Sequence, residues 1–149
     1  MKKMFLAFAT SLLVSAAFAQ DLKQEVFSNQ KGAINGYDPV AYFTENKPMK
    51  GNHSLSFKWN NATWYFASKG NLESFKANPE KYAPQFGGYC AYGLSQGKKA
   101  PTDPAAFTIV DDKLYLNYNA TVKQMWLKDE KNYIMMANNN WPNLKDKAE

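Results

Sequence analysis

The sequence has one cysteine, one histidine and no arginine among its 149 residues. With Cys90 as the sole cysteine, no disulfide can form within the chain, so a packed core must stabilise it. With His53 as the sole histidine, there is no paired-histidine metal motif and only one conventional base for a catalytic triad. All 18 basic residues are lysines, and no planar guanidinium group is present for two-point contact with phosphate or guanine. Because these lysines are scattered, we do not expect nucleic-acid binding.

Residues 1–19 have the pattern of an export signal. Lys2 and Lys3 precede an apolar stretch, and Ala17-Phe18-Ala19 fits a signal peptidase site. The stretch is short for a membrane span and polar residues follow it at once, which favours cleavage over a retained anchor. We expect a protein released into a bacterial periplasm, or secreted as the alternative, with no stable membrane insertion after cleavage. Loss of the two lysines lowers the formal charge from +5 to +3, a mild value.

Aromatic residues make up 15% of the chain, and most fall at positions that a strand or helix pattern turns inward. The sequence therefore predicts an α+β fold, a small single domain in which two helix/β-hairpin/helix units pack around a shared aromatic core. Residues 20–35 are expected to form an N-terminal lead, with Val26 and Phe27 as its anchors. Residues 36–142 form the predicted domain, and residues 143–149 form a polar tail that is expected to fray.

Turn and cap signals place the individual elements. Asn60-Asn61 and Asp111-Asp112 each separate two short apolar runs and predict tight hairpin turns. A further break is expected near residues 128–132. Four residues are predicted to cap helices, the aspartates because each precedes a proline: Asp38, Ser68, Asp103 and Asn119.

These elements occur twice in the same order. An offset of 51 residues pairs Ser68 with Asn119, Phe75 with Trp126, and Tyr82 with Tyr133. Either an internal duplication or the small repertoire of αβ motifs can produce such an order. If the halves are duplicated units, the segment around Cys90 joins them, and pockets often form between packed units.

Three segments carry a family resemblance: GYDPVAYF at 36–43, WYFAS at 64–68 and FKANPEKYAPQFGGYCA at 75–91. They resemble the exported bacterial branch of the YHS-domain proteins, and the similarity continues to Trp141-Pro142. The wider family is similar to small metal-binding modules in which cysteines follow the Asp-Pro-Val and Tyr-Phe steps. Here the matching residues are Ala41 and Ala67, so the resemblance implies the scaffold without the thiolate cluster.

Three interpretations of Cys90 stay open: an inert buried side chain, a redox or nucleophilic thiol, and a ligand of copper or zinc. The resemblance implies that selenocysteine stands at the matching position in some relatives, which favours the reactive thiol. Gly87, Gly88 and Tyr89 are expected to shape the site, since the two glycines let backbone amides approach the sulfur.

His53 and Met49 lie in one predicted loop and are the further candidates for soft-metal ligands, although an exposed imidazole without a ligand is the simpler alternative for His53. The standard catalytic signatures are missing. The leading prediction is a noncatalytic periplasmic binding module involved in soft-metal handling, with a metal ion or a periplasmic molecule as its partner. The alternatives are a thiol-dependent redox protein that uses Cys90, and a structural or interaction domain in which Cys90 is buried.

Overall fold

The computed structural model describes residues 24–149, so the expected signal peptide at 1–19 lies outside the described part of the chain. Within the described range, helices combine with three two-stranded antiparallel sheets, and the predicted α+β class is confirmed. The first half contains β1 (Ser28–Asn29), β2 (Gly32–Ala33), the 3-10 turn η1 (Ile34–Gly36), α1 (Ala41–Thr44), β3 (Asn52–Trp59), β4 (Ala62–Phe66), α2 (Lys69–Ala77) and α3 (Pro79–Tyr82). The second half contains the 3-10 turn η2 (Gln85–Gly88), α4 (Ala91–Ser95), β5 (Phe107–Val110), β6 (Lys113–Leu116), α5 (Ala120–Leu127) and α6 (Glu130–Leu144).

The predicted turns and two of the predicted caps are present. Both residues of the Asn60-Asn61 turn and both of the Asp111-Asp112 turn have positive φ, between 49° and 59°. Asparagine and aspartate tolerate this left-handed conformation, which two-residue hairpin turns require. The side chain of Ser68 accepts a hydrogen bond from the Asn71 N–H at the start of α2, and the Asn119 side chain does the same for α5. These caps satisfy helix N–H groups that have no partner within the helix.

Three local predictions were wrong. No helix follows Asp103, because its carboxylate accepts the Ala105 N–H at 2.9 Å and closes only a turn. His53 lies in β3 rather than in a loop. α6 continues through Pro142 to Leu144, so the polar tail is shorter than expected. Pro142 has no N–H to donate to the carbonyl of Asn138 four residues earlier, and Asn138 is an exposed residue.

The two hairpins and their following helices are related by the predicted offset. The β3–β4 register pairs Trp59 with Ala62, and the β5–β6 register pairs Val110 with Lys113. In the first half the ring of Trp64 lies 5.2 Å from that of Phe75, with an angle of 35° between the rings. In the second half the equivalent rings, Tyr115 and Trp126, lie 5.4 Å apart at 37°. Matching registers and ring geometry favour an internal duplication over a chance similarity of order.

Each unit starts with an unusual left-handed turn. Ile34, Asn35 and Gly36 have positive φ, and so do Phe86, Gly87 and Gly88. Each turn is followed by a tyrosine and then by Asp38 in the first unit or Cys90 in the second. The Asp38 N–H donates to the Met49 carbonyl at 2.8 Å, and the Cys90 N–H donates to the Ala100 carbonyl at 3.0 Å. The counterpart of Asp38 is therefore Cys90 and not Asp103. The Cys90 segment is the beginning of the second unit (residues 86–144) and does not join two complete halves.

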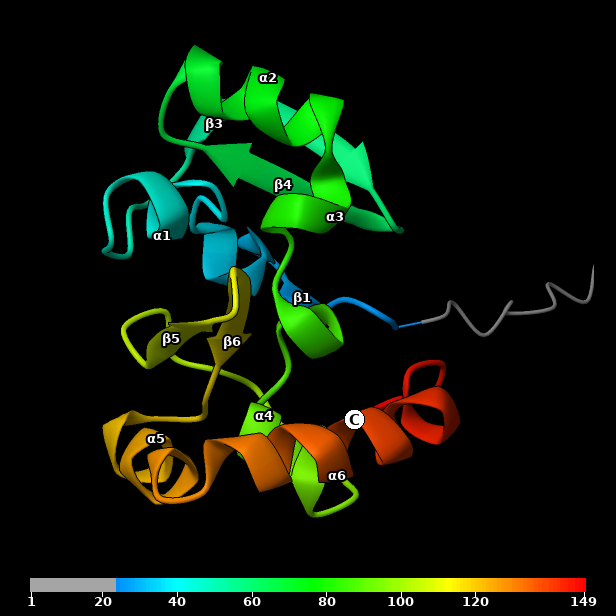
Figure 1. The fold of residues 1–149 in the computed structure, drawn as a ribbon. Helices are drawn as coiled ribbons and strands as arrows, with labels where there is room; N and C mark the ends of the chain where they lie inside the picture. Colours follow the sequence, from blue (N-terminus) through cyan, green and yellow to red (C-terminus); the bar gives the residue numbers. More distant parts are fainter. Residues whose placement is uncertain (1–23) are drawn as a thin grey trace, which may run out of the picture.

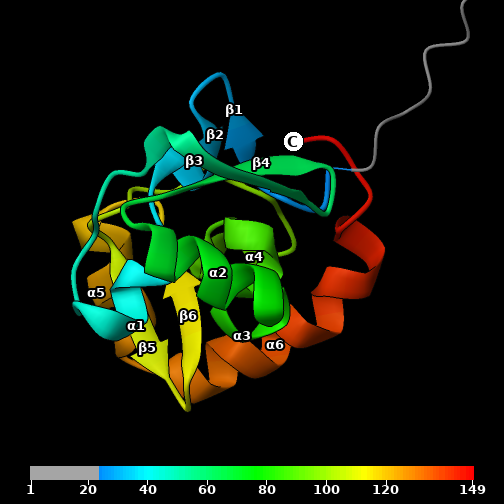
Figure 2. The ribbon, with the colours of Figure 1, turned by 90° about the horizontal axis from the view of Figure 1, so that it is seen from above.

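The aromatic side chains form two clusters that meet at β6. Leu114 and Leu116 pack into the first cluster with Trp64 and Phe75, whereas Tyr115 packs into the second with Trp126. This division follows from the strand geometry, in which successive side chains point to opposite faces. Figure 1 shows β5 and β6 between the β3–β4 end of the molecule and the end formed by α4, α5 and α6. Figure 2 shows α2 lying along the β3–β4 hairpin, against which it packs.

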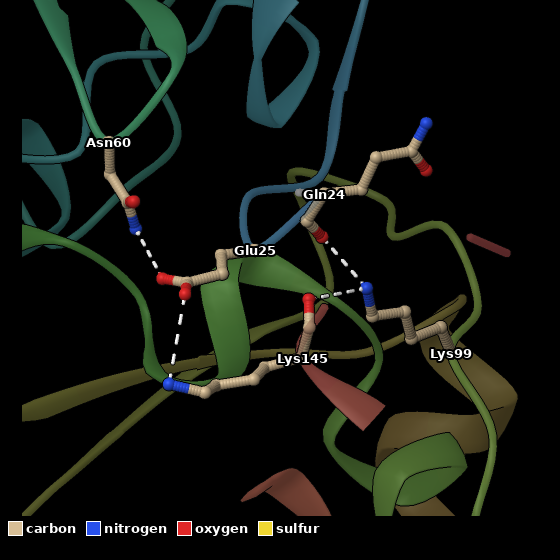
Figure 3. Close-up of polar contacts among 5 residues, drawn as sticks. All are labelled: Gln24, Glu25, Asn60, Lys99 and Lys145. Atoms are coloured by element: carbon tan, nitrogen blue, oxygen red, sulfur yellow. Dashed lines mark hydrogen bonds and ion pairs between the residues drawn. The ribbon is translucent and has the colours of Figure 1, made fainter. Parts of the chain in front are cut away.

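The first described residues are fixed by contacts with both units. Val26 and Phe27 are buried, as predicted, and the Phe27 N–H donates to the Gly87 carbonyl at 2.9 Å. The Lys99 ammonium group donates to the backbone carbonyls of Gln24 and Lys145 (Figure 3). The chain near residue 24 is thereby tied to the end of α6. Within residues 24–149, no helix is both long enough and apolar enough to span a membrane.

Candidate functional site

Cys90 is a buried hydrogen-bonding residue at the N-terminus of α4. Its side chain is 2% exposed, and its Sγ atom accepts hydrogen bonds from the Gly93 N–H at 3.4 Å and the Tyr118 N–H at 3.3 Å. The thiol in turn donates to the side-chain oxygen of Asn117 at 3.5 Å. Cys90 therefore caps α4 and also connects it to the residue before the cap of α5.

Burial raises the pKa of the Cys90 thiol, and the nearby N–H groups of Gly93, Tyr118 and Tyr92 reduce this rise without reversing it. Desolvation penalises the charged form, so the protonated thiol is favoured in the folded protein. The thiolate is the form that attacks disulfides and binds soft metals. The folded environment thus opposes both of these reactions at Cys90.

Asp38 has the equivalent position in the first unit, although it is not the predicted helix cap, because the residue that directly precedes α1 is Val40. Its carboxylate is fully buried and accepts the N–H groups of Val40 at 2.8 Å and Ala41 at 3.3 Å, at the start of α1. It also accepts from the Ala67 N–H at 2.8 Å and the Asn71 side chain at 2.7 Å. Ala67 immediately precedes the cap of α2, as Tyr118 precedes the cap of α5. Each side chain thus fixes a short helix to the start of a longer one, with four donors in the first unit and two in the second.

The three residues predicted to shape the Cys90 site contact other parts of the fold. A Cβ atom on Gly87 would lie 1.6 Å from the Glu25 carbonyl oxygen, and one on Gly88 would lie 2.5 Å from a methyl group of Ile34. The Tyr89 hydroxyl donates to the Gln24 carbonyl at 3.2 Å. The space at these glycines is therefore used by the N-terminal segment and by the first unit.

His53 lies in β3 and Met49 in the loop before it, whereas Cys90 lies at the start of α4. His53 is exposed on β3 and stacks on Tyr65, with the ring centres 4.5 Å apart. Met49 is half-buried in the preceding loop, and its carbonyl accepts the Asp38 N–H. Figure 1 places β3 and α4 at opposite ends of the fold. The structure therefore does not bring Cys90 together with the other two predicted metal ligands.

A pocket beside η1 is lined by His53 and is here called the His53 pocket. It has a volume of about 470 Å³ and opens to solvent. Its wall comes from the β1–β2 turn, from η1 and the residue after it, from the segment that leads into β3 and the start of β3, and, through Pro104, from the second unit. The lining residues are Lys31, Asn35, Gly36, Tyr37, Lys50, Gly51, His53 and Pro104.

Residues 40–86 match the family model of the YHS domain. The chain contains a YHS domain. The matched range covers α1 to α3 and ends inside η2, so it corresponds to most of the first unit. Asp38 lies just before the matched range, and the Gly-Gly-Tyr-Cys-Ala segment lies just after it. No curated protein and no solved structure matches the chain.

The YHS domain is consistent with a metal-binding module, a role that requires several donor side chains close together. Ala41 is fully buried and Ala67 is half-buried at the positions where relatives are expected to carry cysteines. Within residues 24–149, no group of three or more His, Cys, Asp or Glu side chains could hold a metal ion. A thiolate-type metal centre therefore does not fit the residues of this YHS domain.

Sequence reasoning missed Asn117 and the equivalence of Cys90 with Asp38 at the start of the two units. Asn117 is fully buried, its oxygen accepts the Tyr92 N–H at 3.1 Å, and its side-chain nitrogen has no partner among the described residues. The signal for this equivalence was present: Gly36-Tyr37-Asp38 and Ala41-Tyr42 match Gly88–Tyr92 once Pro39-Val40 is treated as an insertion. Aligning the tyrosines instead of the Asp-Pro pairs would have identified Cys90 as the counterpart of Asp38.

Proposed function

We propose that this protein is an exported, noncatalytic binding module and that the His53 pocket is its ligand site. Export rests on the sequence pattern of residues 1–19. The binding role rests on the pocket, whose size is in the usual range for sites of small molecules. Lys50, Gly51 and His53 lie within the range matched by the YHS model, Lys31 to Tyr37 precede that range, and the second unit adds Pro104.

The main support for this proposal is that the pocket is lined by polar groups that form no ion pair or hydrogen bond within the described part of the protein. Within residues 24–149, Lys31 and Lys50 form no ion pair and the Tyr37 hydroxyl forms no hydrogen bond. The Cys90 thiol, by contrast, has three hydrogen-bond partners inside the protein. Groups without internal partners are the ones left to contact a ligand.

The thiol-dependent alternative is less well supported. A redox thiol needs access to its substrate and a substantial fraction of thiolate. Cys90 is 2% exposed and its pKa is raised by burial. These observations favour the reading in which Cys90 is structural.

Soft-metal handling in the periplasm is the second candidate, favoured by the YHS domain itself. Its donors would be His53 and Met49, which lie four residues apart on and before β3. Titration with Cu(I) and Zn(II) under reducing conditions tests it, with His53→Ala, Met49→Leu and Cys90→Ser as variants. Binding that is stoichiometric and lost in His53→Ala would support this candidate, whereas unchanged binding in all three variants would remove the predicted ligands.

The binding proposal is tested by recording amide NMR spectra of the purified protein during titration with a panel of charged and uncharged small molecules. We expect shifts concentrated at Gly36, Gly51 and His53. A panel that shifts none of these signals would overturn the assignment of the pocket. Export is tested separately by cell fractionation and by sequencing the N-terminus of the released protein, which should begin at Gln20.

A further inference from the structure

The charge of the His53 pocket narrows the chemistry of its ligand. Lys31, Lys50 and His53 line it, and no aspartate or glutamate does. The segment that carries Lys50 is held in place by an isolated bridge to Tyr37 and by the hydrogen bond from the Gly51 N–H to the Gly36 carbonyl at 2.9 Å. Two lysines that are 19 positions apart in the sequence thus reach one hollow on a fixed backbone.

The nearest carboxylates in the sequence do not neutralise this pocket. Asp38 follows the lining residue Tyr37, but its carboxylate is buried with four donors. Asp103 precedes the lining residue Pro104, and one of its oxygens accepts the Ala105 N–H in a turn. Neither belongs to the pocket wall. The local excess of positive charge is therefore left for a ligand.

The polar groups of the pocket are also partly preorganised. Stacking on Tyr65 restrains the His53 ring, and the Asn35 side chain is fixed by hydrogen bonds with Asn29 at 2.7 Å and Thr102 at 3.0 Å. Gly36 and Gly51 contribute backbone without side chains to the wall. Groups that are already held lose less conformational freedom when a ligand binds.

We propose that the His53 pocket binds a small oxyanion with two or more negative charges, such as phosphate or a di- or tricarboxylate. This inference rests on the proposed function and specifies its ligand class. Lysine ammonium groups attract such anions as point charges, and the Tyr37 hydroxyl supplies a directional donor. Because both lysines are exposed, each contributes modestly: removal of one should weaken binding roughly threefold, and removal of both roughly tenfold. High salt should weaken binding further.

The test is an NMR titration of the protein with inorganic phosphate and with citrate, alongside glycerol as an uncharged probe and spermidine as a cationic one. Lys31→Gln, Lys50→Gln and the double variant remove the charges with similar side-chain length. Lys69→Gln is the matched control, since Lys69 is an exposed lysine at the start of α2 outside the pocket. We expect saturable shifts at Gly36, Gly51 and His53 with the anions only, with roughly tenfold weaker binding in the double variant and no change in the control.

The outcomes separate the two proposals. If glycerol or spermidine shifts the pocket signals and the anions do not, the anion inference is wrong and the binding role stands. If the anions act equally on the double variant, their effect is nonspecific and the inference is again wrong. If no probe of this or the wider panel reaches the pocket, both proposals fail.

Discussion

The structural role assigned to Cys90 can be tested by replacing its thiol group with a hydrogen atom, in Cys90→Ala, or with a hydroxyl group, in Cys90→Ser. Cys90→Ala removes the acceptor of the Gly93 N–H, and loss of a helix cap costs about 1 kcal/mol. It also removes the acceptor of the Tyr118 N–H, and an unpaired buried donor costs about 1–3 kcal/mol. Sulfur is a weak acceptor, so the low end of that range applies, and we expect a total loss of about 2–3 kcal/mol.

Cys90→Ser separates hydrogen bonding from packing. The serine hydroxyl is a good helix cap, can accept from Gly93 and Tyr118, and can donate to Asn117 as the thiol does. Its shorter bond to Cβ leaves a small gap, so we expect a loss of less than about 1 kcal/mol, well below that of the alanine variant.

Urea unfolding followed by fluorescence of the four tryptophans gives the free energies of unfolding. Tyr118→Ala is the control, because it removes a side chain that is 52% exposed and keeps the N–H that bonds to Cys90. It should change stability by less than about 0.5 kcal/mol. Equal losses in the alanine and serine variants would refute the assignment, since they would mean that volume rather than hydrogen bonding decides the role of Cys90.

Three further predictions concern the thiol, the left-handed turn and the Lys99 contacts. Burial raises the pKa of the Cys90 thiol above its ordinary value of 9.0, so the stabilisation of its neutral form is present below that value and is lost as pH rises through the folded pKa. Wild type should therefore lose more stability than Cys90→Ser in urea titrations at alkaline pH. At pH 8 a thiol reagent should label Cys90 no faster than the protein unfolds locally. Gly87→Ala should cost more than about 3 kcal/mol in thermal unfolding, because it adds a clash with Glu25 to an unfavourable φ of 62°. The control is Gly97→Ala, where φ is 82° and no atom lies within 4 Å, so that only the backbone cost of about 1 kcal/mol is expected. Equal losses of stability in the two variants would contradict the clash. Lys99→Met should accelerate amide hydrogen exchange at the end of α6, since the Lys99 ammonium group donates to the Lys145 and Lys147 carbonyls. Lys98→Met is the control, because Lys98 is exposed. Unchanged exchange in Lys99→Met would show that these contacts do not stabilise the end of the helix.

Features set by a few adjacent residues were predictable from the sequence. The turns at Asn60-Asn61 and Asp111-Asp112 depend on residues that tolerate positive φ, and the caps at Ser68 and Asn119 depend on one side chain each. The Asp-Pro signal failed at Asp103 because the same side chain that caps a helix can close an isolated turn, and only the following packing decides between them.

Features that join distant segments were not predictable. The His53 pocket needs Lys31 and Lys50 on neighbouring segments, and the bridge between Tyr37 and Lys50 that aligns them has no sequence signature. The burial of Cys90 depends on Asn117 and Tyr118, 27 and 28 positions later. The sequence left three interpretations of the thiol open because all three share the same local pattern.

The different numbers of hydrogen bonds accepted by Asp38 and Cys90 also affect the order in which the two units unfold. Four donors to a carboxylate hold the first unit, while two donors to a weakly accepting sulfur hold the second, beside an Asn117 nitrogen that has no partner among the described residues. Hydrogen bonds to a charged group are roughly twice as strong as those between neutral groups. Partial unfolding should therefore begin where α4 meets α5, leaving the β3–β4 hairpin and α2 intact as the last cooperative unit. The first unit should therefore be the more stable half of the protein, and the second unit should unfold first.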